Sequence, residues 1–165
     1  MSLKRKITPC LMAKSLPDVS LDFLEKKGIR GLIIDLDNTL VPWGSFELPP
    51  RVEAWIKEAQ SRGFKIFLVS NALEERVNHF RESLDIPGIS QAQKPRRGAF
   101  RLALAQMGLE KNQVAVVGDQ LFTDVWGGNR LGLFTVLVSP VNEKELFFTR
   151  LVRRIERRVL KRLKA

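Results

Sequence analysis

Short apolar runs alternate along the chain with longer segments in which apolar residues recur at helical spacing. Five short runs predict strands, at residues 31–34, 64–69, 88–90, 114–117 and 134–138. Four segments between them predict helices, at residues 51–62, 73–84, 97–107 and 122–131, the last weakened by Gly127 and Gly128. Because strands alternate with helices, we expect an α/β fold, a mostly parallel five-stranded sheet with helices on both faces.

A longer helix is predicted at the C-terminal end, over residues 143–164. Residues 146–165 hold eight Lys or Arg and one acid, Glu156, and so carry most of the chain's net charge of +10. One side of the helix forms an apolar stripe of Phe148, Val152, Ile155, Val159 and Leu163. We therefore expect a domain of residues 1–142 and a basic amphipathic helix of residues 143–165, which is part of that domain or appended to it.

Two interpretations of this basic helix are open. Its apolar stripe can lie in a membrane interface while the cations of residues 146–165 bind anionic head groups. Equally, the stripe can pack on the sheet and leave the cations in water. Nucleic acid is a less favoured partner, because aromatic residues other than Phe147 and Phe148 are not interleaved with the cations.

The composition of the chain favours a single globular domain in a reducing compartment. With 165 residues, 44% of them hydrophobic, the chain can bury the core of one domain. No apolar run approaches the length of a membrane span, and the N-terminal region lacks a signal-peptide pattern. The single cysteine, Cys10, excludes an internal disulfide and fits a reducing compartment. We expect a cytoplasmic protein, able to associate with the inner face of the membrane, whose oligomeric state the sequence does not indicate.

Polar residues follow the predicted strands. Asp35 and Asp37 lie where the first strand ends, and residues two apart in an extended segment point to the same side. Two unpaired carboxylates are costly in an apolar environment, so the pair indicates a cation. Later strands are followed by Ser70-Asn71, by Lys94-Pro95, and by Asp119 with Asp124.

These residues are expected to meet, because ligand sites in open α/β sheets lie at the carboxyl ends of the strands. A nucleophilic acid, a hydroxyl, an ammonium and a cation are what phosphoryl transfer requires. Carboxylate oxygens without His or Cys suit Mg²⁺. Each residue alone has a simpler explanation: the Asp pair as a turn, Ser70, Asn71 or Asp119 as a helix cap, Lys94 as a surface residue. Their order along one chain favours the phosphate site.

The ordered set resembles the haloacid dehalogenase (HAD) superfamily of phosphatases, with a DxDx[TV] motif, a Ser, a distal Lys and a GDxxxxD-type motif over residues 35–124. Residues 16–19 and 28–40 also resemble the YqeG-type, capless subclass III members. These are similar to the mitochondrial and plastid phosphatidylglycerophosphate phosphatases. The resemblance covers about residues 8–140, but Leu36 stands where mitochondrial members commonly have Lys, which weakens the transfer of that substrate.

The resemblance implies a role for each motif residue. Asp35 is the expected nucleophile, and Asp37 the general acid and then the base. Asp35, Ser70, Asn71 and Lys94 are expected to bind the phosphoryl group. The expected Mg²⁺ ligands are Asp35, Asp119 and the Asp37 backbone carbonyl, with Asp124 supporting the metal shell or orienting Lys94.

The gaps between motifs have no room for the lid domain that many HAD enzymes carry. An open site suits a phosphate presented at a surface, so we expect a phosphomonoesterase acting on a lipid phosphate, with phosphatidylglycerophosphate as the preferred candidate. The alternatives are a phosphatase for soluble phosphoesters or phosphoproteins, and an RNA- or ribosome-binding module. Trp43 and Phe46 form either a flap or part of the core, and His79 is expected to be exposed and non-catalytic.

Overall fold

The computed structural model of the protein describes residues 6–141 and 154–161. Its strands are β1 (Leu11–Ala13), β2 (Gly31–Ile34), β3 (Lys65–Val69), β4 (Gly88–Ile89), β5 (Val114–Gly118) and β6 (Phe134–Val138). Its α-helices are α2 (Leu21–Lys26), α3 (Pro50–Ser61), α4 (Glu74–Leu84), α5 (Gly98–Met107) and α6 (Trp126–Asn129), and residues 154–161 are the described turns of the C-terminal helix. There are also two 3₁₀ turns, η1 (Leu16–Asp18) and η2 (Lys111–Gln113), and a π-helical turn, η3 (Leu121–Val125).

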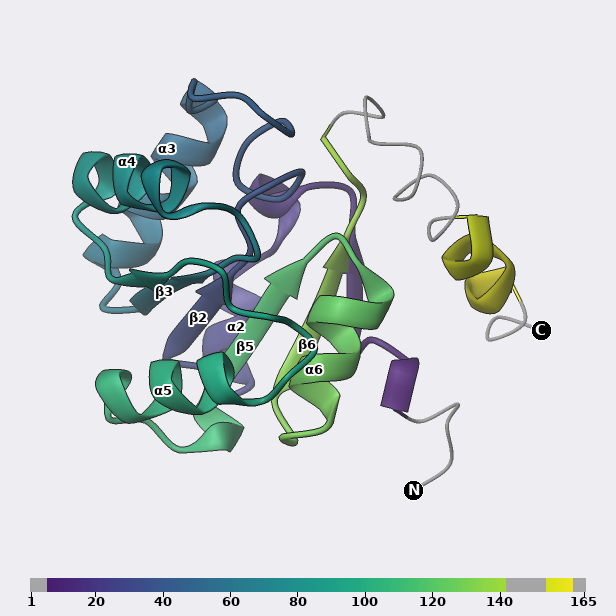
Figure 1. Ribbon diagram of the computed structural model, residues 1–165. Coiled ribbons are helices and arrows are strands. Elements are labelled where there is room, and N and C mark those ends of the chain that lie inside the picture. Colours follow the sequence, from purple (N-terminus) through teal and green to yellow (C-terminus); the bar gives the residue numbers. More distant parts are fainter. Residues whose placement is uncertain (1–5, 142–153, 162–165) are drawn as a thin grey trace.

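These six strands form one parallel sheet in the order β1-β6-β5-β2-β3-β4 (Figure 1). The predicted α/β fold is therefore confirmed, whereas the predicted number of strands was one too low. The missed strand is β1, which pairs with β6 in the register Leu11↔Val136. Its three residues are too few to show the periodicity by which a strand is recognised in a sequence.

Side chains of the central strands alternate between two apolar layers. In β2, Leu32 and Ile34 enter a cluster shared with α2, α3 and α4, whereas Ile33 enters a second cluster shared with α5. Figure 1 shows α3 and α4 on one side of the sheet and α5 on the other. Because helices cover both faces, the central strands are apolar at every position rather than at every second one.

The weak helix predicted near residues 122–131 is built as η3 followed directly by the short helix α6. A Cβ atom at Gly127 would lie 2.6 Å from the Phe100 ring of α5, and one at Gly128 would lie 2.7 Å from Thr135 of β6. The two glycines that lower helix propensity are therefore needed for close packing.

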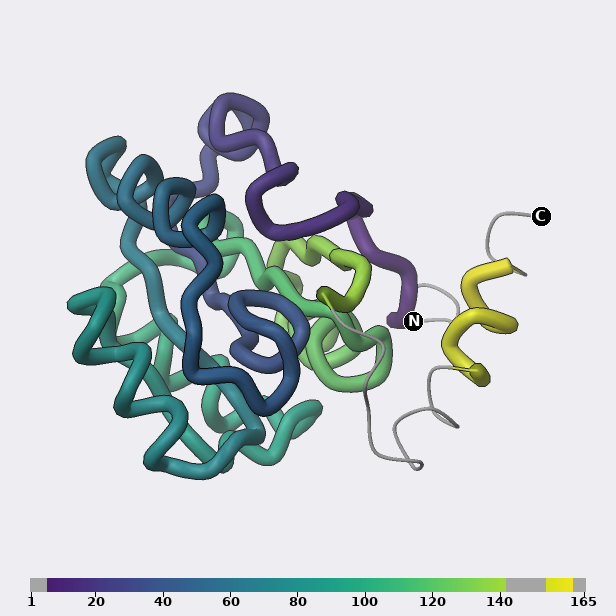
Figure 2. Tube along the Cα trace, turned by 90° about the horizontal axis from the view of Figure 1, so that it is seen from above, coloured from purple at the N-terminus to yellow at the C-terminus, as the bar shows by residue number. Residues whose placement is uncertain are grey.

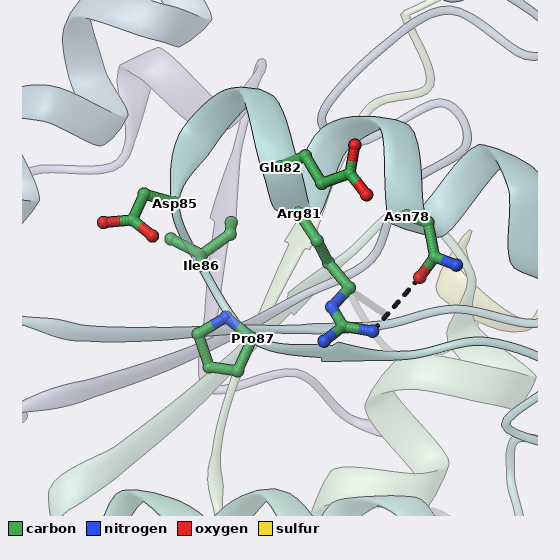
Figure 3. Close-up of a pocket in the computed structure, with 6 residues that line it drawn as sticks. All are labelled: Asn78, Arg81, Glu82, Asp85, Ile86 and Pro87. Carbon is green, nitrogen blue, oxygen red and sulfur yellow. Dashed lines mark hydrogen bonds between the residues drawn. The ribbon is translucent and has the colours of Figure 1, made fainter.

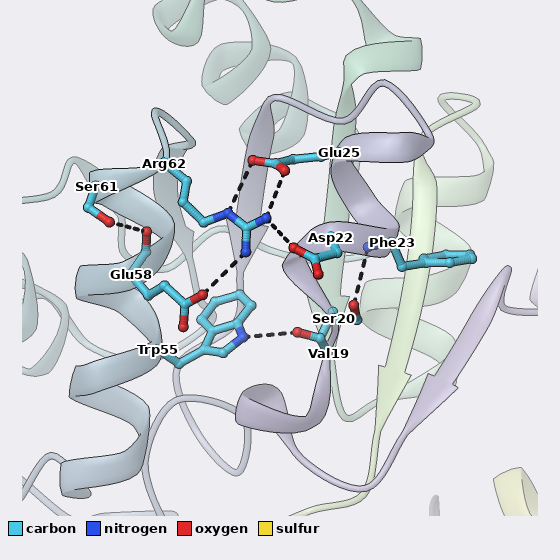
Figure 4. A network of polar contacts seen from close by, with 9 residues as sticks. All are labelled: Val19, Ser20, Asp22, Phe23, Glu25, Trp55, Glu58, Ser61 and Arg62. Carbon is cyan, nitrogen blue, oxygen red and sulfur yellow. Dashed lines mark hydrogen bonds and ion pairs between the residues drawn. The ribbon is translucent and has the colours of Figure 1, made fainter.

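Polar contacts connect α2 and the segment before it to α3 (Figure 4). Arg62, directly after α3, forms ion pairs with Asp22 and, at 2.7 Å, with Glu25 of α2. Its hydrogen bonds lower the pKa of both carboxyl groups. The Trp55 indole donates a hydrogen bond of 3.0 Å to the Val19 carbonyl oxygen. These contacts fix the helices of this layer relative to each other.

Candidate active site

Asp35 lies at the centre of the carboxyl edge of the sheet. It follows β2, where Ile34 is paired with Leu68 of β3 on one side and Val117 of β5 on the other. The Asp35 N–H donates to the Val117 carbonyl oxygen at 3.0 Å, so Asp35 continues the ladder. Figure 1 shows β2 between β3 and β5. The segments that follow these two strands therefore flank Asp35, as the sequence predicts.

Lys94 forms two ion pairs in the site. Its ammonium nitrogen lies 2.7 Å from an Asp35 carboxylate oxygen and 2.6 Å from one of Asp124. The Asn71 side chain accepts a hydrogen bond from the Lys94 N–H at 2.8 Å and donates to the Lys94 carbonyl oxygen at 3.4 Å. The Lys94–Pro95 peptide bond is cis. Lys94 thus connects the segments that follow β2, β4 and β5, and Asn71 holds its backbone.

Three buried carboxylates face one another beside this ammonium. Asp35, Asp119 and Asp124 each offer an oxygen atom within 4.8 Å of the others. The Thr39 hydroxyl donates to Asp119 Oδ1 at 3.2 Å, and the Gln120 N–H donates to Asp124 Oδ2 at 3.2 Å. The first and last acidic motifs of the chain are therefore brought together, as predicted.

The charges of this cluster do not balance. Burial disfavours the charged form of Lys94, but the Asp124 and Asp35 carboxylates outweigh it and raise the pKa of Lys94. Burial raises the pKa of Asp124 to about 6, against the opposing effect of Lys94. Three buried carboxyl groups face one ammonium, so a further cation would lower the cost of holding negative charge in this buried place. This all-oxygen donor set fits a hard divalent cation.

Gly118, the last residue of β5, makes room for the Asp124 carboxylate. A Cβ atom on Gly118 would lie 2.2 Å from both Cγ and Oδ2 of Asp124, far inside van der Waals contact. The backbone of Gly118 and the Asp124 side chain therefore occupy space that only a glycine leaves available. This gives a steric reason for the glycine that precedes Asp119 in the motif.

Asp37 is paired with Arg76 of α4 and stands apart from the carboxylate cluster. Arg76 donates to Asp37 Oδ1 at 2.5 Å, and the Gly44 N–H donates to the same oxygen at 3.4 Å. Burial raises the pKa of Asp37, while Arg76 and Asp35 act on that pKa in opposite directions. A carboxyl group with a raised pKa suits proton donation. Sequence reasoning missed Arg76, because no local pattern links a helix residue to an acid 39 positions earlier.

Ser70 and Asn71 do not cap the following helix. α4 begins at Glu74, its N-cap residue is Leu73, and no side chain caps it. The Ser70 Oγ accepts a hydrogen bond of 3.1 Å from the Ala72 N–H, which leaves its own hydrogen to donate. Ser70 is almost fully buried at the carboxyl end of β3. Binding of a phosphoryl oxygen by Ser70 and Asn71 remains a prediction.

The loop after Asp37 is exposed and tied to α4. Trp43 is 47% exposed and Phe46 is 45% exposed, so neither belongs to the core. The Arg76 guanidinium lies over the Phe46 ring, 5.1 Å from its centroid, and donates to the Ser45 carbonyl oxygen at 2.8 Å. His79 is exposed, as predicted, with its Nε2 atom 3.1 Å from the Phe46 carbonyl oxygen.

Comparison with known proteins agrees with this geometry. The HAD-hydrolase-like family profile matches residues 91–144. The chain is 43% identical over 162 residues to the probable phosphatase YqeG of Bacillus subtilis (strain 168), covering 98% of this chain and 94% of the relative. The chain belongs to the YqeG family of HAD phosphatases.

A more distant relative has a named lipid substrate. This YqeG-family phosphatase is 28% identical over 166 residues to phosphatidylglycerophosphate phosphatase 1, chloroplastic/mitochondrial, of Arabidopsis thaliana. The alignment covers 94% of this chain and 48% of the relative, so the chain spans about half of the plant protein. The fold is also similar to that of the cobalt-bound deoxy-D-mannose-octulosonate 8-phosphate phosphatase of Haemophilus influenzae, with a TM-score of 0.55 and 15% identity. That structural match covers 82% of this chain and 89% of the other.

The C-terminal helix of this YqeG-family phosphatase contacts the segment between Asp119 and Asp124. Glu156 is 4% exposed, and its carboxylate accepts a hydrogen bond of 3.1 Å from the Phe122 N–H. Val159 and Leu160 pack on a cluster that includes residues of η3. In Figure 2 the described helical turns lie far from α4, on the α6 side. Sequence reasoning treated Glu156 as a lone acid and missed this contact.

The predicted apolar stripe is only partly buried. Val159 packs against the domain, but Ile155 is 47% exposed, because the docked side is centred on Glu156 instead. The other stripe residues, Phe148, Val152 and Leu163, lie outside the described residues. Within the described parts of the chain, no helix has the length and hydropathy to cross a membrane.

A hollow distant from the motif residues lies at the other end of α4 (Figure 3). Its lining residues are Asn78, Arg81, Glu82, Asp85, Ile86 and Pro87. The hollow lies where the chain enters β4, whereas the motif residues follow the carboxyl ends of the strands. The hollow is lined by side chains of both charges and by none of the predicted site residues. The candidate active site is therefore placed at the carboxyl edge of the sheet and not in this hollow.

Proposed function

We propose that this phosphatase is a Mg²⁺-dependent phosphomonoester hydrolase that forms an aspartyl-phosphate on Asp35 and acts on a membrane-presented lipid phosphate. The observation that carries the chemical part is the pairing of Lys94 with both Asp35 and Asp124 beside a third carboxylate. This arrangement holds a nucleophile next to a cation-binding set of oxygens. Phosphatidylglycerophosphate is the preferred substrate, with phosphatidylglycerol as the product.

The residues that would hold Mg²⁺ are Asp35, Asp119 and Asp124, together with the Asp37 backbone carbonyl. The ion, when bound, neutralises charge on the phosphoryl oxygens and on the acids that approach them. Asp37 contributes no carboxylate oxygen to the described cluster, since its side chain pairs with Arg76. Its carboxyl group is therefore available for proton transfer while its backbone serves the metal.

The reaction follows from what these side chains can do. An Asp35 carboxylate oxygen attacks phosphorus, the bond to the leaving oxygen breaks, and Asp37 donates a proton to that oxygen. Asp37 then removes a proton from the water that attacks the aspartyl-phosphate, releasing phosphate and restoring Asp35. Lys94 balances the charge of nucleophile and phosphoryl group, and the Ser70 hydroxyl donates to a phosphoryl oxygen.

The lipid substrate is supported by the openness of the site. In the described chain, the β2–β3 connection holds an exposed loop and α3, and the β3–β4 connection holds only α4. Neither contains a lid that would enclose a small metabolite. The name of the Arabidopsis relative points in the same direction. Leu36, which stands where mitochondrial members commonly have Lys, is fully buried in the core cluster on the α3 and α4 side.

The basic helix also supports approach to an anionic surface. Arg154, Arg157, Arg158 and Lys161 are exposed on the described turns, while Glu156 faces the domain. Each such cation near an anionic membrane contributes about 1 kcal/mol of binding free energy. RNA would attract the same cations, but a purely binding function leaves the buried acids and Lys94 without a purpose. Soluble phosphoesters or phosphoproteins remain the second candidate substrates, because the Asp35 site itself does not select a lipid.

The test is phosphate release from phosphatidylglycerophosphate in detergent micelles, compared with glycerol 3-phosphate and a phosphoserine peptide. We expect Mg²⁺-dependent turnover, lost with EDTA and restored by added Mg²⁺, and a kcat/KM for the lipid at least about tenfold above either soluble compound. Equal values on all three would favour the general phosphatase. Salt-sensitive RNA binding without turnover on any of them would favour the binding module.

Arg76 gives a prediction that separates positioning of Asp37 from folding. Without the Arg76 contact, Asp37 loses its fixed orientation and donates its proton less well. Arg76→Ala should therefore lower kcat on glycerol 3-phosphate, a poor leaving group, by about 100-fold, and on p-nitrophenyl phosphate by less than about threefold. Arg76→Lys should restore part of the loss. An equal loss on both esters would mean that Arg76 acts only through stability.

A further inference from the structure

Half of the large apolar side chains that are exposed in the described chain surround the candidate active site. Four of the eight are Trp43 at 47%, Phe46 at 45%, Leu73 at 67% and Val141 at 43%. They come from the segments that follow β2, β3 and β6, all at the carboxyl edge of the sheet. We call these four residues the apolar rim. The other exposed apolar residues are scattered over β1, α2, α5 and the C-terminal helix.

Backbone contacts hold the apolar rim in place around the catalytic motifs. Asn38, which has a positive φ of 60°, accepts a hydrogen bond on its side chain from the Trp43 N–H at 3.3 Å. Its carbonyl oxygen accepts another from the Val141 N–H at 3.2 Å. Leu73 is the N-cap residue of α4, three positions after Ser70. The rim residues are therefore fixed close to the site rather than carried on long free loops.

The chemistry of the rim favours a bilayer over an anionic ligand. The rim segments carry exposed acids (Glu47, Glu74, Glu75), and exposed bases (Arg96, Arg97) lie in the segment that follows β4 at the same edge of the sheet, so charge of one sign does not define the surface. The rim consists of single exposed apolar side chains, one of them Trp, at the same edge of the sheet as the polar motif residues. Aromatic and aliphatic side chains of this kind insert into the interfacial layer of a membrane. The motif residues at this edge then face the layer in which lipid phosphates lie.

We propose that the apolar rim is a membrane-docking surface, with Trp43, Leu73 and Val141 entering the interface of a lipid bilayer. The bilayer then covers the lidless site, so that a lipid phosphate reaches Asp35 without first leaving the membrane. This inference rests on the proposed lipid substrate and adds a second contact, distinct from the basic helix. Because docking is apolar, it depends weakly on salt, unlike binding by cations.

The test compares a rim variant with a matched control in the full chain. The double variant Trp43→Ser/Leu73→Ser removes two rim side chains, and Phe46 is left intact because it packs on Arg76. The control is Leu102→Ser on α5, which is 48% exposed and lies outside the rim. Binding is measured by co-sedimentation with phosphatidylcholine vesicles containing phosphatidylglycerophosphate in high salt. Turnover is measured on these vesicles and on p-nitrophenyl phosphate.

We expect the rim variant to lose at least about tenfold in vesicle binding and in vesicle turnover, and to keep its rate on p-nitrophenyl phosphate. The Leu102→Ser control should behave as the wild type. Vesicles should also shift the tryptophan emission of the wild type to shorter wavelength, since Trp43 is exposed, whereas Trp55 is buried and Trp126 is only partly exposed. In Trp43→Phe that shift should be absent.

The outcomes separate the docking surface from the substrate. Vesicle turnover that is unchanged in the rim variant overturns the inference and leaves the proposed substrate standing. Rim-dependent vesicle binding without hydrolysis of the lipid overturns the proposed substrate and leaves the docking surface standing. Failure of the wild-type chain to bind the vesicles in high salt overturns the inference. The apolar rim would then be assigned to a protein partner instead of a bilayer.

Discussion

Replacing Asp35 by Asn is expected to reduce phosphate release by at least about 10³-fold while the fold is retained. The amide oxygen of Asn can still accept a hydrogen bond from Lys94, so the contact that now measures 2.7 Å survives, but a neutral amide is a very poor nucleophile. The substitution also removes one of three buried carboxylates that face one another, which relieves repulsion. The melting temperature should therefore be unchanged or higher when Mg²⁺ is absent.

The measurements are kcat on a soluble ester and on micellar lipid, with circular dichroism and thermal melting as controls for folding. Asp22→Asn is the matched variant, because Asp22 is an exposed acid of α2 that pairs with Arg62 far from the site. It should keep near-normal activity. A near-normal rate for Asp35→Asn would instead show that another group attacks the phosphorus, and the aspartyl-phosphate assignment would be wrong.

Gly118→Ala is expected to weaken Mg²⁺ dependence and turnover together, although no ionisable group is changed. The new methyl group would lie 2.2 Å from the Asp124 carboxylate, so Asp124 or the end of β5 must move. Asp124 pairs with Lys94 and belongs to the acid cluster, so the displacement reaches both the cation site and the ammonium. Disturbing such supporting contacts costs about 10- to 100-fold in metal affinity.

The control for this prediction is Gly98→Ala at the start of α5, where an added Cβ meets nothing within 4 Å. That variant should titrate with Mg²⁺ as the wild type does. Titration of activity with Mg²⁺ gives the apparent affinity for both variants, and saturating Mg²⁺ should recover part of the Gly118→Ala rate. Unchanged Mg²⁺ affinity in Gly118→Ala would mean that Asp124 supports folding and not the cation.

The sequence predicted those parts of the site that depend on strand order. Asp35, Lys94, Asp119 and Asp124 each follow an apolar run, and a parallel sheet must bring the ends of such runs to one edge. Helices were predicted to within one or two residues where caps and glycines mark their ends, as in α3 and α5. The order of the motifs along the chain therefore predicted that their side chains lie at one edge of the sheet.

Other contacts depend on tertiary geometry that has no local signal in the sequence. Arg76 reads as one more charge on a helix surface, yet its guanidinium reaches Asp37 at 2.5 Å. Glu156 reads as an exception in a basic segment, yet it is buried against the Phe122 amide. Gly127 and Gly128 indicated a weak helix, whereas their function in the fold is close approach to Phe100 and Thr135. Each depends on a partner that only the folded chain identifies.

The contact between Glu156 and Phe122 changes what a deletion of the C-terminal region would measure. Removing that region takes away cations, but it also takes away the acceptor of a backbone amide two residues before Asp124. A shortened chain that lost activity would thus confound loss of membrane recruitment with distortion of the acid cluster. The two effects are separable at single-residue level, because the cations of the described turns (residues 154–161) are exposed, whereas Glu156 is buried against the domain.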